Sequence, residues 1–418
     1  MTERPAYRWY VLGLLTLTSL FSIADRLVFS ILLQDIKAAF NLTDTQLGLL
    51  GGLAFTATYV LAGFPAARLA DRSTRRTIVG AAIAFWSIMT ALCGAATGFW
   101  TLFLARTGVG VGEGCSGPSS QSLISDYFRR EELARAMGIL TLGATCGTVT
   151  GLIAGGLLAD AYGWRMAFVL MGLPGLLIAV LIILTIREPE RGRYAPPGAR
   201  IKQQPIRETL ASLTANRVFM GLMAGFAVQI MIGYAMAFWM APIALRRFDL
   251  PVRDVALYLG LAFLAGGIPG PLAGGFLTDL LVRRDERWRA WFPGIVSLLA
   301  IVPLTLALLA DTFPMFLGLF ALSYAIFVSS QPPILSGIQA AVEPNQRGMA
   351  VAFALFFNNL VGQALGLGVI GILSDMLPSR FGMSGLAQAT LAVSLFAGII
   401  ALLLFGWTAR QMPRAGPA

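Results

Sequence analysis

Histidine is absent from this 418-residue chain, and charged residues make up only 12% of it. Without an imidazole, the Ser-His and Cys-His pairs of covalent catalysis and the H-E-x-x-H zinc motif are all excluded. The three cysteines, Cys93, Cys115 and Cys146, have neither an even number nor a metal-ligand spacing. The sequence therefore predicts a protein that is not an enzyme and that needs no metal or other cofactor.

Apolar residues are what the chain has in quantity, at 57%, whereas a soluble domain carries about 25% charged residues. Runs of roughly 20 apolar residues, the length that spans a bilayer as a helix, recur from end to end. The first run is too long, and too closely followed by others, for a cleaved signal peptide. We expect an all-α membrane protein with about twelve spans, near 9–33, 45–67, 77–97, 99–125, 136–158, 166–186, 216–243, 254–281, 290–309, 314–340, 349–373 and 386–409.

Positive charge alternates between the two sides of these spans. Loops on the side of the N-terminus hold 23 of the 31 lysines and arginines, and the opposite loops hold six. Because positive charge marks cytoplasmic loops, both termini are expected in the cytoplasm and the protein in the inner (plasma) membrane. The net charge of +10 is then a sign of membrane topology, and no nucleic-acid partner is expected.

The chain reads as a duplicated six-span unit. A basic, proline-rich linker at 187–214 separates an N-terminal bundle, 1–186, from a C-terminal bundle, 215–418. At one constant offset, the residues that follow the second span recur after the eighth: Leu69, Asp71, Arg75 and Arg76 match Leu277, Asp279, Arg283 and Arg284. Arg135 before the fifth span is likewise matched by Arg347 before the eleventh.

These features resemble the major facilitator superfamily. The stretch from Ala67 to Arg76 is similar to its G-x-L-x-D-R-x-G-R-R motif, with Ala67 and Thr74 where glycines are usual, and RTGVGVGE from Arg106 is similar to R-x-x-x-G-x-G. Asp25-Arg26, the GVGVGEG stretch and FNLTDTQLGLLGG look like the Spinster branch, which is associated with lysolipids and sphingolipid phosphates. The resemblance implies two pseudo-symmetric six-helix bundles with a substrate site between them near the midplane.

Four charges lie deep in the expected spans: Asp25 and Arg26 in the first, and Arg106 and Glu113 in the fourth. Each costs roughly 2.5–3.5 kcal/mol at the centre of a membrane helix, so partners are expected. One arrangement has Arg26 reaching Glu113, with Asp25 left to carry a proton nearby. Coupling to protons through Asp25 and Glu113 is one interpretation, and a static ion pair that only fixes helix packing is the other. Which carboxylate would take the proton stays open.

The repeated loops suggest a latch on the cytoplasmic side. Asp71 and Asp279 end the second and eighth spans, where each is expected to meet the positive N-terminal end of a span in the other half. The remaining residues assigned to this gate are Arg72, Arg75, Arg76, Asp126, Arg135, Arg283, Arg284 and Arg347. For the arginines, anchoring of the topology alone is an equal alternative.

Glycines cluster in two spans, at 108–117 in the fourth and at 143–156 in the fifth. Small residues let membrane helices approach closely, and no strand precedes them as a dinucleotide loop would need. We expect helix packing at both. Leu152 stands where antiporters of the family have proline, which argues against antiport.

The second half contributes neutral polar groups and no deep charge. We expect an amphipathic cavity lined by Gln229, Tyr234, Trp239, Ser329, Gln331, Asn358, Asn359 and Gln363. Such a wall, opposite Arg26 or Arg106, suits an amphiphile with an anionic head. The alternative is that several of these side chains only pack helices or face lipid.

The sequence thus predicts a monomeric secondary transporter, coupled to protons, for a small organic anion or a lysolipid-like amphiphile in the bilayer. An uncoupled facilitator in which Asp25 and Glu113 only gate is the alternative. A membrane-embedded sensor is disfavoured because the tail after Arg410 is only QMPRAGPA. The substrate, the choice between import and export, and the choice among symport, antiport and uniport stay open.

Overall fold

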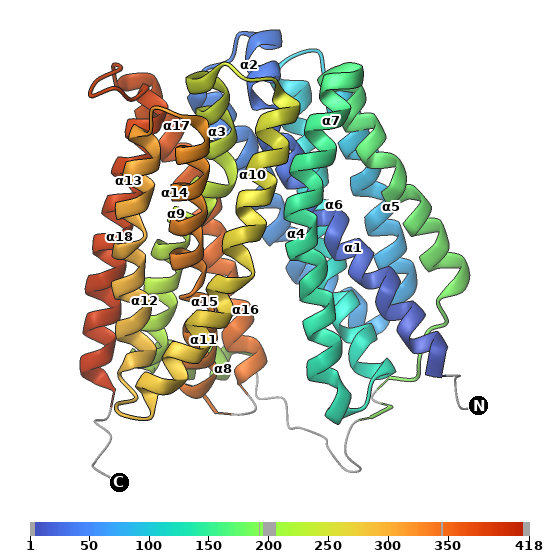
Figure 1. Cartoon of the computed structure of the whole chain (residues 1–418). Coiled ribbons are helices and arrows are strands. Elements are labelled where there is room, and N and C mark those ends of the chain that lie inside the picture. Colours follow the sequence, from blue (N-terminus) through green and yellow to red (C-terminus); the bar gives the residue numbers. More distant parts are fainter. Residues whose placement is uncertain (1–4, 192, 195–205, 344–345, 413–418) are drawn as a thin grey trace. The chain divides into compact units, whose positions relative to one another are not determined.

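The computed structural model describes residues 5–191, 193–194, 206–343 and 346–412. Helices dominate these ranges, and the one extended feature in them is an isolated bridge between Arg380 and Met383 (Figure 1). The contacts divide the chain into two compact units. Unit 1 is Met1–Ala199 with Leu250–Gly260, and unit 2 is Arg200–Asp249 with Leu261–Ala418.

Unit 1 is built from the helices drawn in blue to green in Figure 1: α1 (Pro5–Ile31), α2 (Leu33–Phe40), α3 (Asp44–Gly51), α4 (Leu53–Arg72), α5 (Arg75–Gly94), α6 (Phe99–Tyr127) and α7 (Arg130–Thr185). The last of these contains both the fifth and the sixth expected spans, which meet without an intervening coil. Only Gly163 leaves the helical region, with φ 80°, a left-handed conformation that glycine adopts without a steric cost.

Close helix packing in unit 1 follows the glycines. Along α7, glycines at four-residue spacing face α1, and a Cβ added at Gly143, Gly147 or Gly151 would come within 2.4 Å of an α1 backbone oxygen. In α6 the glycines alternate: Gly110 and Gly114 face α4, while those at 108 and 112 face α5. The packing role expected for both glycine clusters is confirmed, except at Gly117, which has open space around it.

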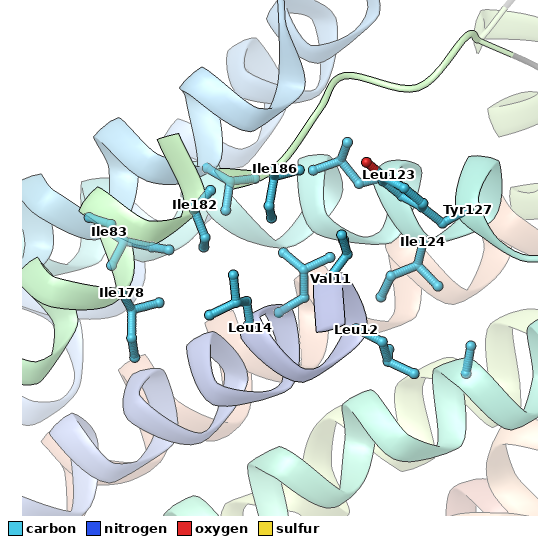
Figure 2. Close-up of a cluster of buried hydrophobic side chains, with 14 of the residues drawn as sticks. Val11, Leu12, Leu14, Ile83, Leu123, Ile124, Tyr127, Ile178, Ile182 and Ile186 are labelled. Carbon is cyan, nitrogen blue, oxygen red and sulfur yellow. The ribbon is translucent and has the colours of Figure 1, made fainter. Parts of the chain in front are cut away.

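Apolar side chains from α1, α5, α6 and α7 fill the interior at one end of unit 1. Figure 2 shows Leu14 of α1 facing Ile178 and Ile182 of α7, while Leu123 and Tyr127 of α6 lie farther along, on the other side of Ile186. Burying a side chain of this size away from water contributes about 1.5–3 kcal/mol in a soluble core. Inside a membrane, tight packing rather than exclusion of water holds such helices together.

Unit 2 follows in Figure 1 from yellow-green to red, with α8 (Ile206–Ala215), α9 (Arg217–Phe248), α10 (Val252–Gly267), α11 (Pro269–Val282), α12 (Trp288–Leu299), α13 (Ile301–Leu309), α14 (Phe313–Val328), α15 (Gln331–Ala340), α16 (Arg347–Phe357), the π-helix η1 (Asn358–Leu365), α17 (Gly366–Met376) and α18 (Gly385–Gln411). The first residues of α10 belong to unit 1, where Arg253 lies 3.6 Å from Asp160 of α7. The main pairs within unit 2 are α9 with α18, α12 with α18, and α9 with η1.

Ten stretches of the described chain are long and apolar enough to cross a membrane. One of them, Glu131–Thr185, holds two spans that meet at Gly163. Helix α6 is not among the ten, because Arg106, Glu113 and several glycines interrupt its apolar character. Counting that helix and both spans of α7 gives twelve, and the all-α fold is confirmed.

The last part of the segment expected as a linker, 187–214, forms helix α8, which was not expected from the sequence. Leu213 of α8 is buried, and Ser212 accepts a hydrogen bond from Gln346 at 3.3 Å. Helix α8 therefore packs onto unit 2 near the start of α16. The expected linker residues 195–205 lie outside the described residues.

Candidate functional site: a buried charge cluster

Arg26 and Glu113 form an ion pair inside unit 1. The guanidinium donates from Nη2 at 2.7 Å and from Nε at 3.0 Å, and both bonds end on Glu113 Oε2. Ser22, one turn earlier on α1, donates to the same oxygen at 2.6 Å. The Glu113 side chain is completely buried, and that of Arg26 is 16% exposed. The contact expected from the sequence between the first and fourth spans is present.

The second oxygen of Glu113 has a different environment. Oε1 is buried and has no hydrogen-bond partner among the described residues. A carboxylate bound through one oxygen only is unusual for a structural pair, because an arginine fork matches both oxygens of a carboxylate. The pair thus leaves one buried acceptor of Glu113 free.

Arg106, two turns before Glu113 on α6, makes no ion pair within the described chain. Its guanidinium carbon lies 4.4 Å from the ring centre of Phe29 and 5.2 Å from that of Phe55. The residue is 1% exposed, and its Nε and Nη1 have no hydrogen-bond partner in the described ranges. Aromatic faces stabilise this cation, but two of its donors are unused.

Asp25 is buried on the neighbouring side of α1. Its Oδ2 accepts a hydrogen bond from Thr90 of α5 at 2.7 Å, and its Oδ1 has no such partner among the described residues. Both arginines lie within electrostatic range of this carboxylate. Because neighbouring helical residues point about 100° apart, Asp25 meets α5 while Arg26 meets α6.

Several residues of the cluster were not predicted from the sequence. At least one of the four deep charges is contacted by each of Ser22, Thr90, Phe29, Phe55 and Tyr59, and the Tyr59 ring centre lies 5.0 Å from the Arg26 guanidinium carbon. They are ordinary residues of membrane helices. Only Ser22 carried a local signal, since it is one helical turn from Arg26 on the same face.

At another part of unit 1, Arg75 of α5 forms a second buried network. It bonds Asp126 of α6 at 2.5 Å and Glu188, just after α7, at 2.7 Å. It also donates to the backbone oxygens of Ser122 and Pro189. These bonds lie within one unit and join three helix ends.

Other expected gate residues of unit 1 extend this network. Arg76 donates from its side chain to the backbone oxygen of Ile186 at 2.8 Å and from its backbone N–H to the Glu188 carboxylate at 3.1 Å. Arg135 is exposed and stacks on Trp9 at 5.5 Å. The side chains of Asp71 and Arg72 lie outside what the structure describes. A latching role stays a prediction for all of these residues.

In unit 2 the expected gate residues are at the surface. Asp279, Arg283, Arg284 and Arg347 are all exposed, and Arg347 donates to the backbone oxygen of Gln339 at 3.1 Å. Their exposure leaves them free to meet other groups. Their role as a gate also stays a prediction.

The polar residues expected to line a cavity of unit 2 gather around α9. Gln229 donates to Ser330 at 2.6 Å, and Tyr234 donates to Asn359 of η1 at 2.9 Å. Gly362 of η1 packs so closely that an added Cβ would lie 2.2 Å from Ile230. A π-helix is rare and is often found at functional sites, and η1 carries three of the expected residues: Asn358, Asn359 and Gln363.

The remaining members of that set are less uniform. Ser329 donates to the backbone oxygen of Ile326 at 2.6 Å, and Gln331 begins α15 with its Nε2 unpartnered among the described residues. Trp239 is completely buried and packs edge-to-face on Phe238, with ring centres 4.9 Å apart. Its indole N–H is buried and has no hydrogen-bond partner among the described residues. Lining of a cavity stays a prediction for all of these residues.

Comparison with known proteins gives the family. The model of the Major Facilitator Superfamily matches residues 14–367. The chain belongs to this superfamily.

Its relatives indicate that the chain belongs to the Spinster branch of the superfamily. A crystal structure of a bacterial homologue of the human lysosomal transporter Spinster, inward-facing and unoccupied, matches with a TM-score of 0.90 and 28% identity over 99% of this chain and 100% of that one. An MFS-type efflux pump of Mycolicibacterium smegmatis is 31% identical over 93% of this chain and 89% of its own length. A sphingosine-1-phosphate transporter of Danio rerio is 27% identical over 90% of this chain and 78% of its own.

The family settles the broad class. This superfamily member is a multi-pass membrane protein and a transporter of small solutes, and it is not an enzyme. The expected Spinster resemblance is confirmed.

Proposed function

We propose that this protein couples proton movement to the transport of an anionic amphiphile. The buried cluster of Asp25, Arg26, Arg106 and Glu113 is the observation that carries the proposal. Intramembrane ionisable residues are costly and mark ion or substrate pathways. Because the chain has no histidine, carboxylates have to carry the proton.

In the proposed cycle, Glu113 alternates between an ionised form paired with Arg26 and a protonated form that releases it. Release of Arg26 changes how α1 is held against α6, which links the charge state to helix packing. Asp25, bound to Thr90 through one oxygen only, is the second candidate carrier. Alternating access, as is general for this superfamily, would then expose the substrate on each side of the membrane in turn.

The substrate class follows from the charges and the relatives. Arg26 and Arg106 are the two cations of the cluster, and arginine suits the planar, multidentate recognition of phosphate or carboxylate. A neutral polar wall in unit 2, with Gln229, Tyr234 and Asn359, suits the rest of an amphiphile. The relatives include an efflux pump and a sphingosine-1-phosphate transporter by name.

The location and the gate are part of the same proposal. The bias of basic loops supports an inner (plasma) membrane protein with cytoplasmic termini. The networks around Arg75 and the exposed Asp279, Arg283 and Arg284 would then lie at the cytoplasmic side. There they would open and close the path during transport.

A proteoliposome assay tests the proposal. Lysophosphatidate and sphingosine 1-phosphate serve as probes, with a pH-sensitive dye inside the vesicles. Wild-type protein should move protons only when a probe is present, and Asp25→Asn or Glu113→Gln should abolish this movement. Glu132→Gln is the matched control, because Glu132 pairs with Arg8 at 2.6 Å near the end of its helix and should leave coupling intact. Probe transport with no pH effect would instead support an uncoupled facilitator, and wild-type coupling in both variants would leave Arg26–Glu113 a packing pair.

A further inference from the structure

Phe55 of α4 stands at the centre of the charge cluster. The guanidinium carbon of Arg26 lies 4.4 Å from its ring centre, and that of Arg106 lies 5.2 Å from the same point. The two cations are therefore at most 9.6 Å apart, the sum of those two distances. Arg106 is 1% exposed and the Arg26 side chain 16%, so water screens the repulsion between the two cations less than it would at a surface.

The position of the ring is built into the packing of α4 on α6. A Cβ added at Gly110 would lie 2.2 Å from the backbone oxygen of Phe55, so only glycine allows this approach. Gly110 lies between Arg106 and Glu113 on α6. The close contact between α4 and α6 at Gly110 therefore places Phe55 beside the part of α6 that carries Arg106 and Glu113.

Arg106 and Glu113 carry opposite charges on the same helix but do not pair. Arg106 has two buried donors, and Glu113 has one buried acceptor, Oε1, that are unpartnered among the described residues. The two residues are seven apart on α6, hence nearly on one face and about 10 Å apart along the axis. The unpartnered atoms of both residues are buried, yet Arg106 contacts the rings of Phe29 and Phe55 instead of this carboxylate.

We propose that Phe55 is a positioning residue that holds Arg26 and Arg106 as two separate cations and prevents Arg106 from pairing with Glu113. A cation is attracted to either face of an aromatic ring, so one ring can offset the repulsion between two guanidiniums. An aliphatic side chain of similar size has no such attraction. Phe55 thereby leaves Glu113 with one cationic partner and keeps the Arg106 N–H groups available to an anion.

This inference rests on the proposed role of Glu113 in proton coupling. Its structural part, the separation of Arg106 from Glu113, can be tested without measuring transport. If Arg106 paired with Glu113 as well, two cations would hold the carboxylate in its ionised form. The exchange of a proton would then be lost. The loss of Phe55 should therefore act through Arg106 rather than through packing alone.

A set of double-mutant cycles tests the inference without any transport measurement. The cycle combines Arg106→Gln with Glu113→Gln, and reversible unfolding in mixed micelles gives the coupling between the two positions. In wild type the coupling should be small. In a Phe55→Leu background it should rise by on the order of tenfold in the folding equilibrium, the size typical of residues in direct contact. Phe55→Tyr, which keeps the ring, should restore the wild-type value.

Two further variants keep the test decisive. Phe316→Leu removes an equally buried ring that packs on other aromatic rings of unit 2 and should leave the coupling unchanged. If Phe55→Leu does not fold, Phe55→Met replaces it. Equal coupling in the phenylalanine and aliphatic backgrounds, or a Phe55→Tyr variant that behaves like Phe55→Leu, would overturn the inference. If wild-type protein showed no probe-driven proton movement, that result would contradict the proposed function but not the separation of Arg106 from Glu113.

Discussion

Arg26 and Glu113 meet through one oxygen. Three donors, Arg26 Nη2, Arg26 Nε and Ser22 Oγ, all end on Glu113 Oε2 at 2.6–3.0 Å, while Oε1 is buried with no partner in the described chain. A pair that served stability alone would gain more from using both oxygens. Oε2 therefore joins α1 to α6, whereas Oε1 is left without a protein partner in the described chain.

Removal of Arg26 should destabilise the protein strongly. Arg26→Gln leaves the Glu113 carboxylate completely buried and without its cation, and breaking a buried pair in this way costs about 3–5 kcal/mol. Reversible unfolding measures the change. The double variant with Glu113→Gln should recover most of the loss, because no buried charge is then left alone. Arg135→Gln, at an exposed arginine, should change stability little, and a small effect of Arg26→Gln would contradict the assignment.

The contact between α1 and α7 should tolerate no added methyl group. In Gly151→Ala the new Cβ would lie 2.4 Å from the Ala24 backbone oxygen, and overpacking of this kind costs about 1–3 kcal/mol. Gly138, on the same helix, has open space around it. Gly138→Ala should be neutral, or stabilising by up to about 1 kcal/mol through helix propensity. Thermal unfolding of the two variants side by side is the measurement, and equal behaviour would argue against close packing at Gly151.

The segment after α7 should be held in place by Glu188. Its carboxylate bonds Arg75 Nε at 2.7 Å and the Arg76 backbone N–H at 3.1 Å. Glu188→Gln should speed tryptic cleavage at Arg191 by on the order of tenfold or less, since hydrogen bonds to charged groups contribute about 1.5–3 kcal/mol and Glu188 is partly exposed. Glu190→Gln, two residues on and exposed, is the control. Equal cleavage rates in both variants would show that the Glu188 contacts do not restrain this segment.

The turn between α17 and α18 should gain stability from the loss of its aromatic residue. Phe381 has φ +55° and is 83% exposed, so it is strained and packs on little. Arg247 and Gln388 fix the turn through bonds to its backbone oxygens, among them that of Gly382 at 2.9 Å. Phe381→Gly should raise stability by about 1 kcal/mol, because glycine adopts this conformation freely. Ser379→Gly, at an exposed position without positive φ, should lower it slightly, and the same sign for both would contradict strain at Phe381.

Local patterns were enough for much of the architecture. Apolar run lengths predicted the twelve spans, and the match of Asp71 with Asp279 predicted a duplicated helical unit. The glycines of α6 and α7 predicted close packing, which the contacts confirm. These features depend on composition along one helix, and for that reason they can be read without knowing its neighbours. Two local features went unseen: helix α8, and the coil-free junction at Gly163.

The sequence by itself determined which charges lie deep in the expected spans, and it offered Glu113 as one partner for Arg26. Only the tertiary structure decided that Arg106 rests between Phe29 and Phe55, that Asp25 bonds Thr90, and that Arg75 joins Asp126 to Glu188. These partners lie on different helices, and their meeting depends on how each helix is rotated and how closely it approaches. At Gly110 a single missing side chain sets that approach, and through it the place of the Phe55 ring among four charges, three of them buried.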